Sequence, residues 1–404
     1  MPLASCLLRF TSHPSQFRYN EHVKPRILLL HAAAGAGHRR AAEAVAASLR
    51  RCGATVAVHD AIPYTHPIFR AFYVGGGLGM ITRLPRLYGV AYRMADRPTI
   101  DRVLRGPRHQ AQRISAQSLL KAIRVFAPDA IICTHFLPAE LCAGWRRSAQ
   151  LTIPAYTVVT DFEPHRFWQH AGIDGYCVAS DDAADRLARD GVDRSTIAVT
   201  GIPIPSDFAD LPDRSTAFNR LQLDPDRLLL LLMGGGLGVG GIEPVARSLI
   251  GRPIDAQVAI ITGSNQRLRR RLRRMSNDWI VRGFVDNMPE WLAAADVAIS
   301  KAGGLTASEL MAASVPTVIP RGLTGHETHN ALYMALQGAA ALAESSDDAV
   351  EQAMRLLADS EARAGMRLAA ARSARPYAAD TVAEYVLREA RLDTKRATRN
   401  TLAE

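Results

Sequence analysis

The stretch that decides the fold is Arg227-Leu-Leu-Leu-Leu-Leu-Met233-Gly-Gly-Gly-Leu-Gly238-Val-Gly240-Gly241-Ile242. A short, uncharged apolar run of this kind is typical of a strand that is buried on both faces of a parallel sheet. The glycines predict a tight loop, and the residues from about Ile242 onward have the spacing of a helix. Strand, glycine loop and helix in this order open a doubly wound α/β domain.

The same order occurs near the start of the chain. Residues 26–30 predict a strand, residues 32–38 a glycine-containing loop and residues 39–51 a helix. Further strands are predicted at Thr55–Val58, Ala130–Cys133, Ala155–Val159, Gly175–Val178, Ile197–Val199, Gln257–Thr262, Trp279–Val281, Val297–Ser300 and Thr317–Ile319. The proline-rich stretch Pro203–Pro212 is the expected linker. We therefore predict an α/β protein with two Rossmann-like doubly wound domains that face each other across a cleft.

Composition agrees with two packed domains and points to an anionic partner. The chain has 404 residues, of which 48% are hydrophobic, and Lys+Arg 49 against Asp+Glu 39 gives a formal charge of +10. Five cysteines lie without CxxC spacing, which favours reduced thiols and no metal site. No apolar run approaches the ~20 residues of a membrane span. The first 25 residues resemble a loose leader more than a signal peptide.

Much of the positive charge lies in one segment. Residues 83–124 contain ten Lys or Arg residues and two Asp residues, with aromatic and aliphatic side chains within and just before them. Basic residues interleaved with apolar ones suit the surface of an anionic membrane. A solvated helix face and nucleic-acid binding are the alternatives. We expect the segment 64–124 to face a membrane and expect no nucleic acid.

A second motif, at residues 296–310, suggests what the cleft binds. It reads Asp296-Val-Ala-Ile-Ser300-Lys-Ala-Gly303-Gly304-Leu-Thr306-Ala-Ser308-Glu309-Leu310. A strand followed by a Gly-Gly turn and a helix from near Thr306 presents free N–H groups at the helix start, which suits a phosphate. Glu309, expected in the first turn, would accept hydrogen bonds from a ribose. The loop at 325–330 would hold a sugar.

The residues 300–330 resemble the nucleotide-sugar site of the GT-B glycosyltransferases of family 28, which form lipid II and monogalactosyldiacylglycerol. The stretches 160–168 and 199–204 are more similar to the diacylglycerol branch, and the resemblance covers about residues 26–370. It implies a GT-B fold whose last helix, about Ala378–Arg391, returns to the first domain. The implied units are a leader (1–25), an acceptor domain (26–205), a UDP-sugar domain (206–376) and a C-terminal helix with tail (377–404).

The catalytic candidates follow predicted strands of the first domain. His38 begins the helix after the turn at Gly37, where a neutral imidazole can take a proton from an acceptor hydroxyl, and the matching family histidine is the candidate base. Asp161 would orient the acceptor or support His38, although a capping role is the alternative. The residues expected to line the acceptor pocket are Gly37, His135, His165 and Trp168.

The donor candidates lie in the second domain. Gly236 and Gly238 would let backbone N–H groups reach a diphosphate, because no acidic residue ends the next strand as a dinucleotide site requires. Gly304 and Thr306 begin the predicted helix at the phosphate. The resemblance places Phe284 and Val285 at the base, and it places His326 and Glu327 at the sugar. Relatives usually carry Gln where His326 stands, so the identity of the sugar stays open.

These features together predict an inverting glycosyltransferase, a hexosyltransferase that moves a sugar from a UDP-sugar to a hydroxyl of a lipid acceptor of the diacylglycerol type. No Asp-x-Asp stands at a cleft-facing strand end, so we expect no essential metal and no cofactor. We expect a cytoplasmic protein that associates peripherally with the inner face of the membrane. The alternatives are a UDP-sugar epimerase of the same architecture, a polyprenyl-linked acceptor, and a non-catalytic basic membrane-binding protein.

Overall fold

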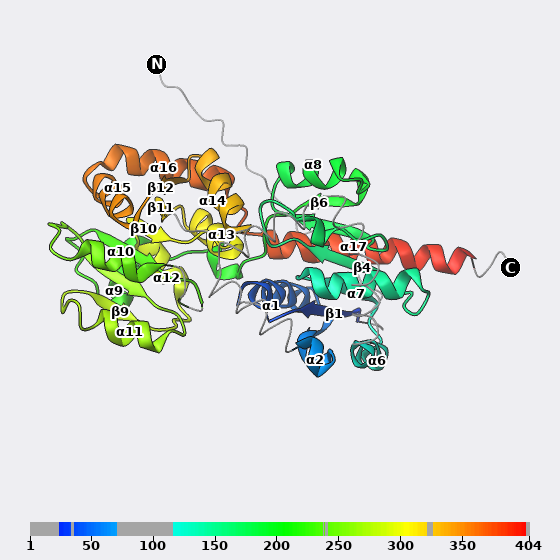
Figure 1. Cartoon of the computed structure of the whole chain (residues 1–404). Coiled ribbons are helices and arrows are strands. Elements are labelled where there is room, and N and C mark those ends of the chain that lie inside the picture. The colour runs from blue at the N-terminus through cyan, green and yellow to red at the C-terminus, as the bar shows by residue number, and fades with distance from the viewer. Residues whose placement is uncertain are drawn as a thin grey trace, which may run out of the picture.

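A computed structural model describes residues 24–33, 36–70, 116–236, 238, 241–320 and 326–400. Two six-stranded sheets, with parallel pairing throughout, form two lobes that lie side by side (Figure 1). This confirms the predicted pair of doubly wound α/β domains. Of the basic segment 64–124, residues 64–70 and 116–124 are described, and the remainder lies outside the described residues.

The first sheet has the order β2-β1-β3-β4-β5-β6. Its elements are β1 (Arg26–His31), α1 (Ala36–Arg51), β2 (Thr55–Asp60), α2 (Pro67–Arg70), α6 (Gln117–Phe126), β3 (Ala130–Cys133), α7 (Phe136–Arg147), β4 (Ala155–Val158), β5 (Gly175–Val178), α8 (Asp181–Arg189) and β6 (Ile197–Val199). The order of the strands reverses between β1 and β3. Ligands of such sheets bind beyond the carboxyl ends of the strands at this reversal.

The second sheet has the order β12-β11-β10-β7-β8-β9, with its reversal between β7 and β10. The strands and helices of this domain are α9 (Arg214–Leu221), β7 (Leu229–Met233), α10 (Ile242–Leu249), β8 (Gln257–Ile261), α11 (Gln266–Leu272), β9 (Ile280–Arg282), α12 (Met288–Ala294), β10 (Val297–Ser300), α13 (Gly304–Ala312), β11 (Thr317–Pro320), α14 (His326–Leu336), β12 (Ala340–Ala343), α15 (Ser346–Ala358) and α16 (Ser360–Ser373). The last helix of the chain is α17 (Ala378–Asn400).

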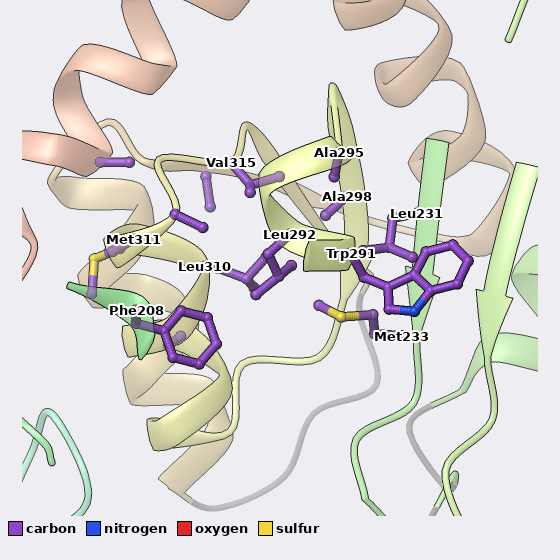
Figure 2. Packing of buried hydrophobic residues seen from close by; sticks show 14 of the residues in the cluster. Phe208, Leu231, Met233, Trp291, Leu292, Ala295, Ala298, Leu310, Met311 and Val315 are labelled. Carbon is purple, nitrogen blue, oxygen red and sulfur yellow. The ribbon is translucent and has the colours of Figure 1, made fainter. Parts of the chain in front are cut away.

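The second sheet is covered on both faces, because successive residues of its strands point to opposite sides. Leu229, Leu231 and Met233 of β7 pack into one cluster, and Leu230 and Leu232 pack into another. Figure 2 shows the first cluster, in which side chains of α12 and α13 meet the strands. Burial on both faces is the physical reason for the uninterrupted leucine run.

The helix α17 returns to the first domain. Val382 and Val386 are fully buried against the first sheet, and Asp380 accepts hydrogen bonds from Ser48 and Arg51 of α1. The chain thus passes between the domains twice, once after Gly201 and once near Arg375, and the two passages are adjacent. A Cβ atom added to Gly201 would lie 2.5 Å from the Cβ of Arg375. The two connections between the domains therefore run next to each other.

The edge strand β12 was not predicted, because its sequence Ala-Ala-Leu-Ala has no β-branched or aromatic residue. The segment around the expected linker, Pro203–Pro212, packs against the second-domain core. Ile202, Ile204 and Phe208 are almost fully buried in the core shown in Figure 2, where Phe208 is labelled. The domain boundaries at 205 and 376 stay a prediction.

The packed linker makes a stability prediction. Replacing Phe208, which is 2% exposed, by Ala is expected to lower the free energy of unfolding by about 3–5 kcal/mol because a cavity replaces the ring. Phe284→Ala is the matched control, since its ring is 61% exposed, and is expected to stay within about 0.5 kcal/mol. Urea denaturation followed by circular dichroism measures both. Equal midpoints for the two variants would contradict the packing.

Candidate active site

The carboxyl ends of both sheets meet at the start of α1. A Cβ atom added to Gly236 would lie 3.0 Å from the Cβ of Ala36, and one added to Gly37 would lie 3.8 Å from Leu305 Cδ1. The start of α1 therefore contacts both the glycine loop after β7 and the start of α13. The two strand-order reversals face each other, as a ligand-binding cleft between two doubly wound domains requires.

His38 lies in the first turn of α1 and is held by two polar groups. Its Nδ1 atom is 2.9 Å from the carbonyl oxygen of Thr134 and 2.9 Å from the hydroxyl of Thr160. A carbonyl oxygen only accepts, so Nδ1 carries the proton and donates it to Thr134. In the neutral ring, the basic lone pair is then on Nε2. This is the tautomer that a general base needs.

Two of the predicted acceptor residues, His135 and Trp168, lie next to His38, but both are almost fully buried. The ring of His135 lies edge-on to His38 at 4.5 Å between centroids, and Trp168 lies at 6.2 Å. His135 is 1% exposed and its Nδ1 accepts from the N–H of Leu137, so it caps α7. Burial holds the pKa of His135 well below its usual range, so its ring is neutral. His135 and Trp168 form the wall behind His38.

His165 has a local structural role. It is 5% exposed, and its Nδ1 accepts from the N–H of Phe167 at the start of the short 3-10 helix Arg166–Trp168. The sequence-based prediction placed His165 in the acceptor pocket. Its burial and capping bond leave it little surface for an acceptor in this structure.

Asp161 lies in the contact between the domains. It is 8% exposed and accepts a hydrogen bond of 3.4 Å from the side-chain amide of Asn330 on α14. Asn330 also accepts from the N–H of Phe162, whose ring stacks on Tyr333. The prediction was that Asp161 supports His38. In the structure the side chain that contacts His38 is that of the preceding residue, Thr160.

Gly304 has no room for a side chain. A Cβ atom at this position would lie 2.0 Å from the carbonyl oxygen of Thr160. The start of α13 therefore packs directly on the backbone of the first domain. Thr306 lies within the first turn of the helix, because α13 begins at Gly304 and not near Thr306 as predicted.

Glu309 is placed differently from the prediction. Since α13 begins two residues early, the carboxylate lies in the second turn, and the first turn contains no acidic residue. Glu309 is 4% exposed, and its Oε1 atom lies 3.2 Å from the Arg40 guanidinium of α1. No described residue gives this Oε1 atom an aligned hydrogen bond. Burial raises the pKa of Glu309, and Arg40 opposes that rise.

Lys301 is a residue that the sequence-based prediction missed. It follows β10, forms an ion pair with Glu327 on α14, and passes beside the glycine loop, because a Cβ atom on Gly235 would lie 3.0 Å from Lys301 Cε. Its ammonium group is a cation next to the loop that was expected to bind a diphosphate. A lysine directly after a buried strand and two residues before Gly303-Gly304 was the available signal.

The glycine loop itself requires glycine at one position. Gly238 has a φ of +63° and a Cβ atom there would lie 2.0 Å from the carbonyl oxygen of Thr262. Its own carbonyl accepts from the Asn265 side chain, which fixes the loop to the end of β8. A small pocket at the ends of β7, β10 and β11 lies beside this loop and includes Met233, Ser300 and Pro320.

Phe284 and Val285, which were predicted to contact the base, differ in their exposure to solvent. Phe284 is 61% exposed, so its ring face is available for stacking, while Val285 packs against the second-domain core. His326 begins α14, and its side chain lies outside the described residues. Among the described ranges, no group of three His, Cys, Asp or Glu side chains has metal-binding geometry.

Two facing doubly wound domains with this site define the GT-B class of glycosyltransferases. Solved structures share the fold. MurG of Acinetobacter baumannii matches over 90% of this chain and 99% of its own, with a TM-score of 0.57 and 16% identity. The S. aureus MnaA–UDP complex covers 90% of this chain and 96% of its own, with a TM-score of 0.60 and 11% identity.

Family models identify both domains. Residues 38–204 match monogalactosyldiacylglycerol (MGDG) synthase, and residues 231–382 match the glycosyltransferase family 28 C-terminal domain. The chain is therefore a GT-B glycosyltransferase whose two domains resemble those of family 28 enzymes. This assignment sets aside the alternative of a non-catalytic membrane-binding protein.

Curated relatives are similar over most of the chain. A processive diacylglycerol beta-glucosyltransferase of Bacillus licheniformis is 33% identical over 242 residues, which are 59% of this chain and 62% of that protein. One of Bacillus thuringiensis is 29% identical over 371 residues, 90% of this chain and 94% of that protein.

The contact at Gly304 makes a prediction about domain closure. Gly304→Ala places a methyl group against the Thr160 carbonyl, so we expect the lobes to separate and stability to fall by about 1–3 kcal/mol. Small-angle X-ray scattering would record a larger radius of gyration. Gly303→Ala is the matched control, because the nearest atom to its added Cβ lies 3.9 Å away. A Gly304→Ala variant as compact and stable as the control would contradict the tight contact.

Proposed function

We propose that this enzyme transfers a hexose from a UDP-sugar to a hydroxyl of a diacylglycerol-type lipid, with inversion at the anomeric carbon. The activity for which the Bacillus relatives are named supports a diacylglycerol acceptor and makes glucose the first sugar to test. The MGDG synthase model over the first domain supports a lipid acceptor on that side. Galactose and N-acetylglucosamine are also to be tested as the transferred sugar. The resemblance places His326 at the sugar, where the family usually has Gln, and so does not fix the sugar's identity.

The observation that carries the proposal is the contact between His38 Nδ1 and the Thr134 carbonyl oxygen, which lie 2.9 Å apart. A proton on Nδ1 satisfies this carbonyl, and Nε2 is then the atom that takes the proton of an acceptor hydroxyl. The oxygen then attacks the anomeric carbon from the side opposite the leaving UDP, which inverts the configuration. The buried His135 and Trp168 behind the ring limit access of water to it.

The second domain supplies the groups that a leaving UDP needs. The start of α13 presents backbone N–H groups and partial positive charge, and the glycine loop and Lys301 lie beside it. Glu309 would accept from the ribose hydroxyls, since its buried Oε1 has no aligned donor among the described residues. Phe284 would stack on the base, and Glu327, held by Lys301, would accept from the sugar.

We also propose that the reaction needs no metal ion, because Lys301 and the N-terminus of α13 supply positive charge at the diphosphate. Lys301 and the helix start take the place that a divalent cation has at the diphosphate in metal-dependent transferases. Activity that persists in excess EDTA is the expected result. Loss of activity in EDTA with recovery on adding Mg²⁺ or Mn²⁺ would contradict this part of the proposal.

We further propose that the enzyme works at the inner face of the membrane as a peripheral protein. None of the described helices is long and apolar enough to cross a bilayer. The basic segment 64–124, with the net charge of +10, would attract anionic headgroups. Co-sedimentation with vesicles that contain anionic lipid, weakening with salt, is the expected behaviour. Equal binding to neutral vesicles would contradict an electrostatic attachment.

Product analysis distinguishes transfer from the epimerase alternative. The enzyme is incubated separately with UDP-glucose, UDP-galactose and UDP-N-acetylglucosamine, with and without diacylglycerol vesicles, and products are identified by mass spectrometry and chromatography. We expect a new glycolipid and release of UDP only when the lipid is present. Conversion of one UDP-sugar into another without lipid would favour the epimerase.

The role of His38 predicts a separation of catalysis from binding. His38→Ala is expected to lower kcat by about 10²–10⁴-fold, because the general base is lost, while the Kd for UDP stays unchanged. Steady-state kinetics and calorimetry measure the two quantities. His59→Ala, on the edge strand β2, is the control and is expected to retain activity. Undiminished kcat in His38→Ala would remove the base from the mechanism.

A further inference from the structure

A buried carboxylate of one domain has its counter-ion in the other. Glu309 lies in the second-domain helix α13 and is 4% exposed, whereas Arg40 extends from α1 of the first domain and its side chain is 31% exposed. The Arg40 guanidinium lies 3.2 Å from Glu309 Oε1. An ion pair across an interface can form only while the two surfaces are in contact.

In the described part of the chain, charged groups on the neighbouring helices have partners of their own. The helices with the most contacts to α13 are α1, α14 and α16. Their charged or titratable side chains include His38 on α1, Glu327 and His329 on α14, and Arg363 and Arg367 on α16. Glu327 pairs with Lys301, His329 with Glu163, and Arg367 with Asp296, and Arg363 binds carbonyl groups of α15. Arg40 is the charge that acts on Glu309.

Resting on the proposed function, we infer that Arg40 is a donor-site residue contributed by the acceptor domain, which positions Glu309 as a charged acceptor for the ribose hydroxyls. The contact is an ion pair without an aligned hydrogen bond at Oε1, so the carboxylate retains acceptor capacity for a ligand. Hydrogen bonds from hydroxyls to an ionised carboxylate are stronger than those to a neutral carboxyl group. Nucleotide affinity is therefore coupled to domain contact through this pair.

The proposed coupling predicts how the UDP affinity of a variant without Arg40 changes with pH. Burial raises the pKa of Glu309 above its ordinary value and Arg40 counteracts that shift. Removing Arg40 raises the pKa further, so a larger fraction of Glu309 is protonated near neutral pH. Raising the pH ionises the carboxylate again. A variant without Arg40 should therefore bind UDP weakly at neutral pH and regain affinity as the pH increases.

The experiment is calorimetric titration of the full-length chain with UDP from about pH 6 to about pH 9. Arg40→Met, which retains bulk but not charge, is expected to bind about tenfold more weakly than wild type near pH 7, with the difference shrinking toward pH 9. Arg40→Lys is expected to restore binding to within about threefold because it restores the positive charge. The control is Arg39→Met, since Arg39 pairs with the exposed Glu43 on the same helix, and it should bind as wild type.

A second set of variants separates positioning from direct contact. In a Glu309→Gln background, Arg40→Met is expected to change UDP affinity no further, because no charge remains to be positioned. An unchanged tenfold loss in that background would mean that Arg40 binds the nucleotide itself, and would overturn the inference. Tighter binding by Arg40→Met, wild-type binding, or a loss independent of pH would overturn it as well. Failure of the wild-type chain to bind UDP would instead contradict the proposed function.

Discussion

The site depends on one short segment of backbone, residues 160–162, which lies between the two domains. The Thr160 hydroxyl contacts His38, while the Thr160 carbonyl lies against Gly304 at the start of α13. The next two residues bind α14 through Asn330. The same three residues therefore orient the proposed base and dock the proposed donor domain. Displacing this segment would disturb the chemistry on one side and the nucleotide site on the other.

The charges of the cleft are balanced in pairs, although the chain as a whole is strongly basic. Glu309 is matched by Arg40 and Glu327 by Lys301. Each pair joins a carboxylate that is suited to hydroxyl groups with a cation that can attract phosphate. A ligand carrying both hydroxyls and phosphates can engage both members. Buried pairs of this kind contribute little to stability by themselves, so their value is in arranging the site.

Much of the fold could be predicted from the sequence, because strands that are buried on both faces consist of uninterrupted runs of apolar residues. Three of the first-sheet strands, 130–133, 175–178 and 197–199, match to the residue. The edge strand β12 was missed because alanines carry no strand signal. The site was predicted less completely. His38 was identified from a motif, but the Arg40–Glu309 and Thr160–His38 contacts join residues more than a hundred positions apart, which local patterns do not record.

The start of α13 shows how a small local error alters a chemical conclusion. A helix beginning at Thr306 would have placed Glu309 in its first turn, whereas in the helix beginning at Gly304 this residue lies in the second turn and is buried. Gly-Gly was predicted to form a turn, yet Gly304 is the first residue of the helix. Glycine is required there because the Thr160 carbonyl of the other domain occupies the space of a side chain.

The adjacent crossings at Gly201 and Arg375 have a mechanical consequence. Two lobes joined by widely separated tethers would resist rotation, and two lobes joined by one tether would swivel freely. Here both connections lie at one location, so together they form a single hinge between the domains. Rotation about this hinge moves the far edges of the two lobes apart without stretching either connection. Substrate could thus enter and product leave without either core being repacked.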